Sequence, residues 1–263
     1  MTKLSRIIIV AALLALAGAA YATSVPGSAS FITRIFNDDP FSTLVTTNTF
    51  PSLVEISDTA VPPAGWANLH AWRLSNDGIS AADFMNVDGF AISADVRISG
   101  TANGEAGLQL APWWSEADGR FNIRTPDGEV AVFGGRLPFY SFTAQQGKSY
   151  VAGTWVRLTM IYRTNVDMNS THPATIEYIY NDGSPASSGQ LPFDEGNPGE
   201  DPPHRLWGIL NPAHVGGYMQ FNNMGGQSGL TMIGSWANIQ VEDLGTVVPS
   251  EATSWGNVKS LFR

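Results

Sequence analysis

Residues 90–98, which read FAISADVRI, decide the fold class of this chain. Every second side chain of this stretch is apolar, and mostly polar side chains stand between them. The apolar set is Phe90, Ile92, Ala94, Val96 and Ile98. A period of two residues is that of a β-strand with one buried face and one polar face.

The same alternation recurs along the rest of the chain. Residues 155–162 and 174–180 alternate in this way, and Asn181-Asp182-Gly183-Ser184 predicts a turn directly after the second of them. Residues 121–124 and 130–133 flank Pro126-Asp127-Gly128, which predicts a further hairpin. Shorter strands are expected at 107–110, 206–210, 218–221, 230–233 and 235–241, and no helical periodicity is found between residues 23 and 244.

Many short strands with turns between them favour a sandwich or barrel. We therefore expect an all-β fold, an antiparallel two-sheet jelly-roll sandwich. The inward residues should be Phe90, Ile92, Val96, Ile98, Val156, Leu158, Met160, Ile239 and Val241.

The first 22 residues have the pattern of a signal peptide. Lys3 and Arg6 precede an apolar run at 7–17 that is too short to span a bilayer, and Ala20-Tyr21-Ala22 fits a cleavage site before Thr23. The alternative is a retained N-terminal anchor. On the first interpretation the protein is exported, to the medium or the cell surface, with a β-sandwich domain at 23–245 and a tail at 246–263.

Composition limits the chemistry and the partners. The chain of 263 residues has no cysteine, which excludes disulfides, thiol nucleophiles, iron–sulfur clusters and thiolate zinc sites. Its net charge of −9 disfavours nucleic acid and anionic membrane surfaces as partners. Only 14% of its residues are charged, against roughly 25% in an average domain.

Four segments together resemble the concanavalin A-like lectin and glucanase superfamily, especially its laminin G-like members. In chain order, these segments are Asp38-Asp39-Pro40-Phe41, the strand at 153–158, the turn at 180–183 and the final strand at 236–241. The resemblance implies a jelly roll whose last strand returns beside the first. The catalytic E-x-D-x-x-E pattern of the glucanases is absent, since the nearest string, from Glu55 to Asp58, lacks its spacing and its final glutamate. We therefore expect a protein that is not an enzyme.

Three aromatic residues are the candidates for ligand binding: Trp113, Trp114 and Tyr140. An exposed aromatic ring is a flat surface on which a sugar ring stacks. Alternatively, one tryptophan packs in the core while the other covers a sheet edge, and Tyr140, after Gly134-Gly135, enters a core strand through a bulge.

Calcium is the one cofactor that the sequence suggests. Asp38, Asp39, Asn238 and Asp243 are the candidate ligands, because calcium takes carboxylate and carbonyl oxygens and because such modules often bind it where the terminal strands meet. Residues 194–201 are a second acidic candidate. The alternative is an Asx turn before Pro40 and solvated acids after the last strand. The four histidines show no metal-ligand spacing, and no Gly-x-Ser-x-Gly elbow is present.

These observations predict an exported, non-catalytic recognition module that binds carbohydrate, with a glycan or a cell-surface component as partner. A structural or assembly subunit of a cell surface or extracellular filament is the alternative, followed by a hydrolase with an unrecognised site. In the tail, Trp255, Val258, Leu261 and Phe262 lie at helical spacing. A short amphipathic helix there would cover the sandwich or contact a partner.

Overall fold

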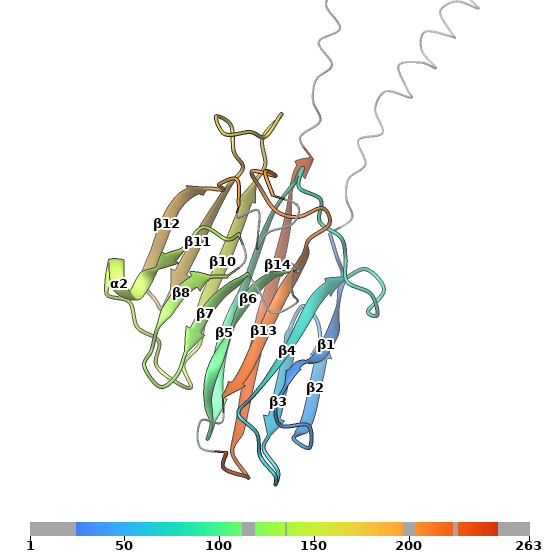
Figure 1. The fold of residues 1–263 in the computed structure, drawn as a ribbon, viewed down its shortest axis with the longest axis vertical. Helices are drawn as coiled ribbons and strands as arrows, with labels where there is room; N and C mark the ends of the chain where they lie inside the picture. Colours follow the sequence, from blue (N-terminus) through green and yellow to red (C-terminus); the bar gives the residue numbers. More distant parts are fainter. Residues whose placement is uncertain (1–24, 112–118, 135, 197–203, 223–225, 247–263) are drawn as a thin grey trace, which may run out of the picture.

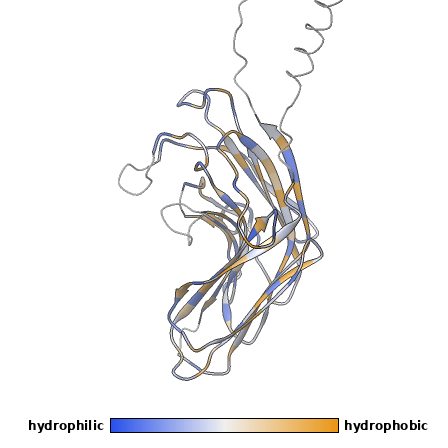
Figure 2. Cartoon of the chain, turned by 90° about the vertical axis from the view of Figure 1, so that its right-hand side faces the viewer, coloured by the Kyte–Doolittle hydropathy of each residue, from blue (hydrophilic) through white to orange (hydrophobic). Residues whose placement is uncertain are grey.

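The chain folds into two antiparallel sheets of seven strands each, packed face to face (Figure 1). The computed structural model describes residues 25–111, 119–134, 136–196, 204–222 and 226–246. The predicted all-β jelly-roll sandwich is confirmed. Seen edge-on, the two layers are curved together (Figure 2).

The first sheet carries the residues discussed below. Its strands, in spatial order, are β1 (Ser28–Asn37), β4 (Ala67–Ser75), β13 (His214–Asn222), β6 (Asn103–Ala111), β7 (Arg120–Arg124), β8 (Val130–Phe133) and β9 (Tyr140–Ser141). The second sheet contains, in spatial order from the end that lies under β8 and β9, β12 (Pro185–Pro192), β11 (Thr175–Asn181), β10 (Val156–Arg163), β5 (Asp88–Gly100), β14 (Thr231–Thr246), β3 (Leu53–Thr59) and β2 (Thr43–Thr49).

A single short helix stands among the described residues. Helix α2 (Phe142–Gln146) follows β9, and the Ser141 side chain caps it by accepting a hydrogen bond from the backbone of Ala144. Gly147, in the left-handed region at φ 65°, ends it. No described helix is long and apolar enough to cross a bilayer.

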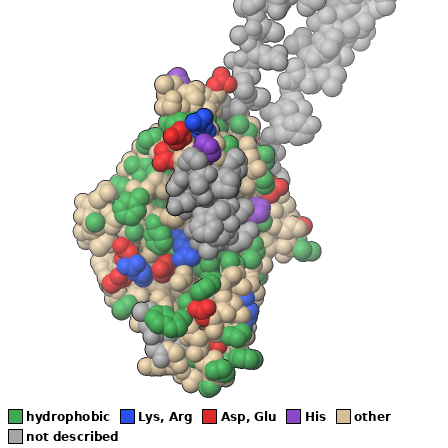
Figure 3. Space-filling model, in the orientation of Figure 1, with side chains coloured by type: hydrophobic (Ala, Val, Ile, Leu, Met, Phe, Trp, Pro, Cys, Tyr) green, Lys and Arg blue, Asp and Glu red, His purple; other side chains and the backbone are tan. Residues whose placement is uncertain are grey.

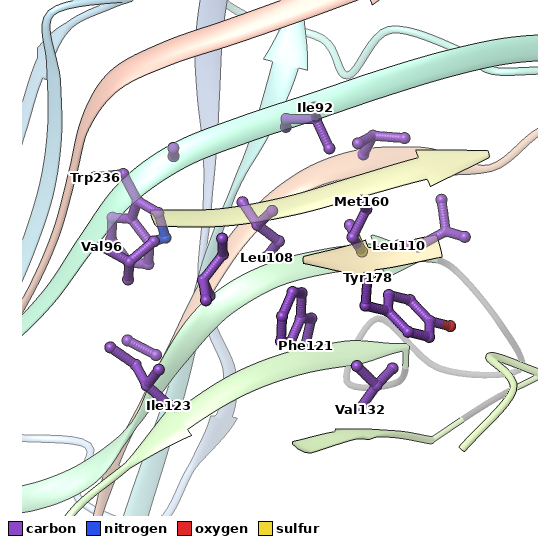
Figure 4. Packing of buried hydrophobic residues seen from close by; sticks show 14 of the residues in the cluster. Ile92, Val96, Leu108, Leu110, Phe121, Ile123, Val132, Met160, Tyr178 and Trp236 are labelled. Atoms are coloured by element: carbon purple, nitrogen blue, oxygen red, sulfur yellow. The ribbon is translucent and has the colours of Figure 1, made fainter. Parts of the chain in front are cut away.

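The core lies between the sheets. Leu108, Phe121 and Val132 of the first sheet point towards Met160 and Tyr178 of the second (Figure 4). Of the nine residues predicted to face inward, eight are less than 5% exposed, and Val241 packs half-buried against the same cluster. The predicted hairpin β7–β8 and the predicted pairing of 155–162 with 174–180, as β10–β11, are present. The turn predicted at 181–184 leads into a further strand, β12, that the sequence did not predict.

Several predicted elements differ from the observed ones. Residues 206–210 form no strand, because Trp207 has a φ of 54°, which breaks an extended backbone; Ile209 and Leu210 are buried there as a loop. The two strands predicted near the C-terminus are one, β14, and a strand, β1, precedes the Asp38 segment. The last strand pairs with β3 and β5 and not with the first strand, which pairs with β4 in the other sheet.

Candidate functional site

Four central strands of the first sheet present polar side chains on the face that points away from the core. Trp72, Met219, Leu108 and Phe121 are core residues of β4, β13, β6 and β7. Since side chains alternate along a strand, their chain neighbours point outward. We call these outward residues the polar face: Arg73, His214, Tyr218, Gln220, Glu105, Gln109, Arg120 and Asn122.

At the centre of this face a glycine lies between two polar side chains. Register places Arg73 beside Gly216 and Gly216 beside Gln109. The Arg73 guanidinium crosses β13 and donates from Nη1 to Oε1 of Gln109 at 2.9 Å. Gly216 also lies close to the backbone of β4, since a Cβ there would lie 2.0 Å from the Trp72 carbonyl oxygen. Arg73 and Gln109 are both fully buried.

A histidine and a tyrosine stand on either side of this glycine along β13. His214 and Tyr218 lie two residues before and two residues after Gly216, on the same face of β13. We call this arrangement of Arg73, Gln109, His214 and Tyr218 around Gly216 the Gly216 site.

Tyr218 is held by charged neighbours. Its hydroxyl donates to Oε2 of Glu105 at 3.1 Å, and the Arg120 guanidinium lies 5.0 Å from the centre of its ring. Arg120 is itself bound to Gln220 at 2.7 Å and to Glu105 at 3.5 Å. Burial raises the pKa of the Tyr218 hydroxyl well above its ordinary value, and the Glu105 charge raises it further. Tyr218 is therefore neutral at physiological pH and can donate a proton.

The two ring nitrogens of His214 differ in their hydrogen bonding. Its Nε2 lies 3.1 Å from Oδ1 of Asp83, which places the proton on Nε2 because a carboxylate accepts. Its Nδ1 is buried and has no hydrogen-bond partner in the described part of the chain. With the proton on Nε2, Nδ1 carries the lone pair of the ring.

The polar face carries charges of both signs. Arg73 and Arg120 contribute two permanent positive charges beside the carboxylate of Glu105, and the Asp83 carboxylate lies against His214, whereas the whole chain carries −9. Figure 3 shows acidic, basic and histidine side chains mixed over the face that it presents. Around the buried Arg73 and Gln109, the side chains of His214, Arg120 and Glu105 are partly exposed, so the rim of the site reaches solvent.

The aromatic residues predicted to bind ligand lie elsewhere. Trp113 and Trp114 fall outside the described residues. Tyr140 lies on the edge strand β9, three strands away from β6, where its hydroxyl accepts from Gln146 and its ring contacts Phe142 at 4.8 Å. Its side chain is half-buried and packs against the core cluster. Stacking of a sugar on these three residues stays a prediction.

The four predicted calcium ligands are not gathered at one place. Asp39 is buried and its backbone N–H binds Asn68, whereas Asn238 donates to Asp95 in a bulge of β14. Asp243 lies five residues further along β14, about 16 Å away, and accepts from Gly245. They separate because β14 pairs with β3 and β5, and not with the first strand next to Asp38.

No group of three or more His, Asp or Glu side chains placed to hold a metal occurs in the described ranges. Part of the acidic loop at 194–201 falls outside those ranges. Calcium binding stays a prediction that melting in calcium and in chelator tests.

The residues of the Gly216 site were not among the sequence-based candidates. Arg73 and Gln109 are 36 positions apart, and only register brings them together. One signal was present, since HAWRLS and GLQLA each hold one long polar side chain in an otherwise mostly apolar strand. Arg73 and Gln109 are buried on the side of the sheet that points away from the core.

No protein-family model matches the chain, and no curated protein matches it. Several solved structures do. The alginate lyase AlgAT5 of Polysaccharide Lyase family 7 is 12% identical with a TM-score of 0.44, covering 83% of this chain and 98% of its own. The alginate lyase from Klebsiella pneumoniae is 8% identical, TM-score 0.46, covering 75% and 84%. The marine PL-14 alginate lyase from Aplysia kurodai is 11% identical, TM-score 0.42, covering 76% and 87%.

These matches correct two predictions. The matched structures are enzymes that act on a polysaccharide, so the predictions of a non-catalytic recognition module and of no enzymatic activity are wrong. The lyases share the jelly-roll type of fold with the lectin and glucanase superfamily that the sequence resembles. At 8–12% identity the likeness is one of fold, and the activity of this chain has to be argued from its own residues.

Proposed function

We propose that this protein is a polysaccharide lyase that cleaves a uronate-containing chain by β-elimination at the Gly216 site. The observation that carries the proposal is the buried Arg73–Gln109 pair across a bare glycine, with a tyrosine at one end and a histidine at the other. The jelly-roll fold and the predicted signal peptide support an exported enzyme that meets its glycan outside the cell.

The first requirement of this reaction is recognition of the sugar carboxylate. A guanidinium binds a carboxylate through two parallel hydrogen bonds, and the Gln109 amide adds a neutral donor beside it. Both side chains are buried, so their interaction with a bound anion is screened less than it would be in water. Hydrogen bonding and charge neutralisation at the carboxylate make the proton on the adjacent C5 carbon easier to remove.

The second requirement is a base and an acid at the reacting bond. In the proposed step Nδ1 of His214 takes the proton from C5, and the electron pair of that C–H bond forms the C4–C5 double bond. The C4–O glycosidic bond breaks, and the leaving oxygen takes the proton of the Tyr218 hydroxyl. His214 then loses its proton to water and Tyr218 regains one, so no water is consumed overall.

Asp83, Glu105 and Arg120 are positioning residues in this scheme. The Asp83 carboxylate holds the His214 ring through Nε2, which orients Nδ1 as the basic nitrogen. Glu105 and Arg120 fix the Tyr218 hydroxyl and ring.

The test is incubation of the full-length protein with alginate, polygalacturonate and hyaluronan, with a neutral glucan as control. Elimination creates a carbon–carbon double bond conjugated with the carboxylate, and ultraviolet absorbance measures it. We expect absorbance to rise with at least one polyuronate and not with the glucan.

Two matched arginine variants show where the activity lies. Arg73→Gln should abolish it, whereas Arg163→Gln, on β10 of the other sheet and paired with Glu177 at 3.1 Å, should keep it. The proposal fails if no polyuronate yields the absorbing product, or if both variants retain equal activity.

A further inference from the structure

A second bare glycine lies diagonally next to Gly216 on the polar face. Register places Tyr218 beside Gly107 on one side and Asn122 beside it on the other. Along β6, Glu105 and Gln109 are the outward neighbours of Gly107. A Cβ at this position would lie 1.8 Å from the Phe121 carbonyl oxygen, so only glycine fits.

The two glycines share Tyr218 and Gln109 as neighbours. In the proposed reaction Tyr218 delivers its proton to the glycosidic oxygen between two sugars. A uronate over Gly216 therefore places the next sugar of the chain over Gly107.

Asn122 has an unusual hydrogen-bonding state for a buried side chain. It is fully buried, and its Oδ1 accepts from the backbone N–H of Ala131 at 3.2 Å. Its Nδ2 has no hydrogen-bond partner in the part of the chain that the structure describes. Asn68, equally buried, donates from Nδ2 to Asp58 and accepts at Oδ1 from Asp39. Buried donors are nearly always paired, and an unpaired one destabilises the fold unless a ligand completes it.

We infer that Asn122 contacts the substrate and determines which sugar is accepted over Gly107. Its Nδ2 donates to a ring hydroxyl, and the Glu105 carboxylate accepts from a neighbouring hydroxyl of the same sugar. The Glu105 charge disfavours a carboxylate at this position. The preferred substrate therefore turns hydroxyls, and not a second carboxylate, towards Gly107. This inference rests on the proposed function and specifies its substrate.

If Asn122 had only a structural role, its Oδ1 acceptor would be sufficient and its Nδ2 donor would not be needed. Holding the Ala131 N–H needs only the Oδ1 acceptor, which an aspartate supplies equally well. Asn122→Asp keeps that acceptor and removes the Nδ2 donor. Asn122→Ala removes both the Oδ1 acceptor and the Nδ2 donor without adding a charge. It replaces the aspartate variant in the experiment if that variant does not fold.

The experiment compares these two variants with Asn68→Asp as the control for replacing a buried, fully paired asparagine. Steady-state cleavage of the polyuronate that the wild-type protein prefers gives KM and kcat, and thermal melting reports the fold. We expect KM to rise about tenfold or more in each folded Asn122 variant, with a smaller change in kcat. Asn68→Asp should lower the melting temperature and leave KM unchanged.

The outcomes separate the two claims. Wild-type cleavage with an unchanged KM in a folded Asn122 variant overturns the role of Asn122 and leaves the lyase proposal standing. Failure of both variants to fold makes Asn122 structural and overturns the role as well. A wild-type protein that neither binds nor cleaves any polyuronate overturns both claims.

Discussion

Tyr218 combines two functions in one side chain. Its ring packs with Leu69 and Ala71 in a small apolar cluster on the outward side of the sheet, and its hydroxyl reaches Glu105. Burial keeps the hydroxyl protonated, which suits a proton donor and not a base. The residue therefore anchors the site through its ring and acts through its single oxygen.

Replacing Tyr218 with phenylalanine removes that oxygen and preserves the ring. We expect kcat on the preferred polyuronate to fall by about 10²-fold or more, since a general acid contributes roughly that much. KM should change little, and the free energy of unfolding should change by about 1 kcal/mol or less. Steady-state kinetics and urea titration measure these quantities. Wild-type kcat in this variant would assign the proton transfer to another group.

Asp58 and His70 form a buried pair between the two sheets. Nε2 of His70 lies 2.9 Å from Oδ2 of Asp58, and Nδ1 accepts from the backbone N–H of Arg34 at 3.0 Å. Nε2 of His70 is therefore the donor to Asp58. Burial acts to raise the pKa of Asp58, but hydrogen bonds from His70, Asn68 and Ser42 together hold it below its ordinary value of 3.8.

Because the pKa of Asp58 is lowered in the folded state, the free energy of unfolding should decrease at acidic pH. The carboxylate form of Asp58 stabilises the folded state fully above its unfolded pKa, and that contribution is lost as pH falls through the lower folded pKa. Asp58→Asn should lower stability at neutral pH and reduce the further loss below about pH 4. Urea unfolding over a pH series measures both effects. Parallel pH profiles for the two proteins would show that other carboxylates cause the acid unfolding.

Strand β13 supplies the core with one face and the site with the other. On the inward face Gly217 lies against the indole nitrogens of Trp72 and Trp236, and Met219 is fully buried. On the outward face Gly216 lies between Arg73 and Gln109, which are joined by a hydrogen bond. The period of two thus builds the packing and the candidate site from one nine-residue strand.

Gly216→Ala tests this element. The added Cβ would lie 2.0 Å from the Trp72 carbonyl, so β4 and β13 must move apart. We expect a loss of about 1–3 kcal/mol in the free energy of unfolding and loss of cleavage. Gly27→Ala is the control, because nothing lies within 4 Å of its Cβ and the substitution restricts the unfolded chain equally. Equal melting temperatures for both variants would contradict the close approach at Gly216.

At the scale of the whole molecule, the second sheet supports the site on the first. Trp236 of β14 donates from Nε1 to the Gly107 carbonyl at 2.9 Å, through the core. It also packs edge-on against Trp72, with ring centres 6.0 Å apart. Gly107, which lies beside Asn122 in the sheet, is thus held by a side chain of the opposite layer.

Trp236→Phe removes this link and leaves the Gly107 carbonyl without its donor. The unpaired group alone should cost about 1–3 kcal/mol of stability, and KM should rise as the glycine loses its support. Trp155→Phe is the matched control, since Trp155 is 42% exposed and contacts Arg97 on the outside at 4.4 Å. That variant should lose about 1 kcal/mol or less. Chemical denaturation of both measures the difference, and equal losses would show that the Gly107 hydrogen bond adds nothing.

The sequence by itself determined the class of fold and which side of each clear strand is buried. The alternation at 90–98 and 155–162 is local, because successive side chains of a strand point to opposite faces whatever its partner is. The turns at 126–128 and 181–184 were also readable, since the residues that favour a turn act within four positions. Stacking of a sugar on the predicted aromatic residues stays a prediction, because these residues lie apart from the polar face or outside the described residues.

The tertiary structure alone decided which strands are neighbours, and hence the site. β14 pairs with β5 and β3, and β4, β13, β6 and β7 lie side by side although they span residues 67–222. Pairing and register follow from how the two inner faces pack together, a long-range property that no local pattern contains. Gln109, Tyr218 and Asn122 lie in predicted strands, whereas Arg73 lies in a strand that the sequence analysis did not predict. Their meeting around two glycines exists only once the sheet has formed.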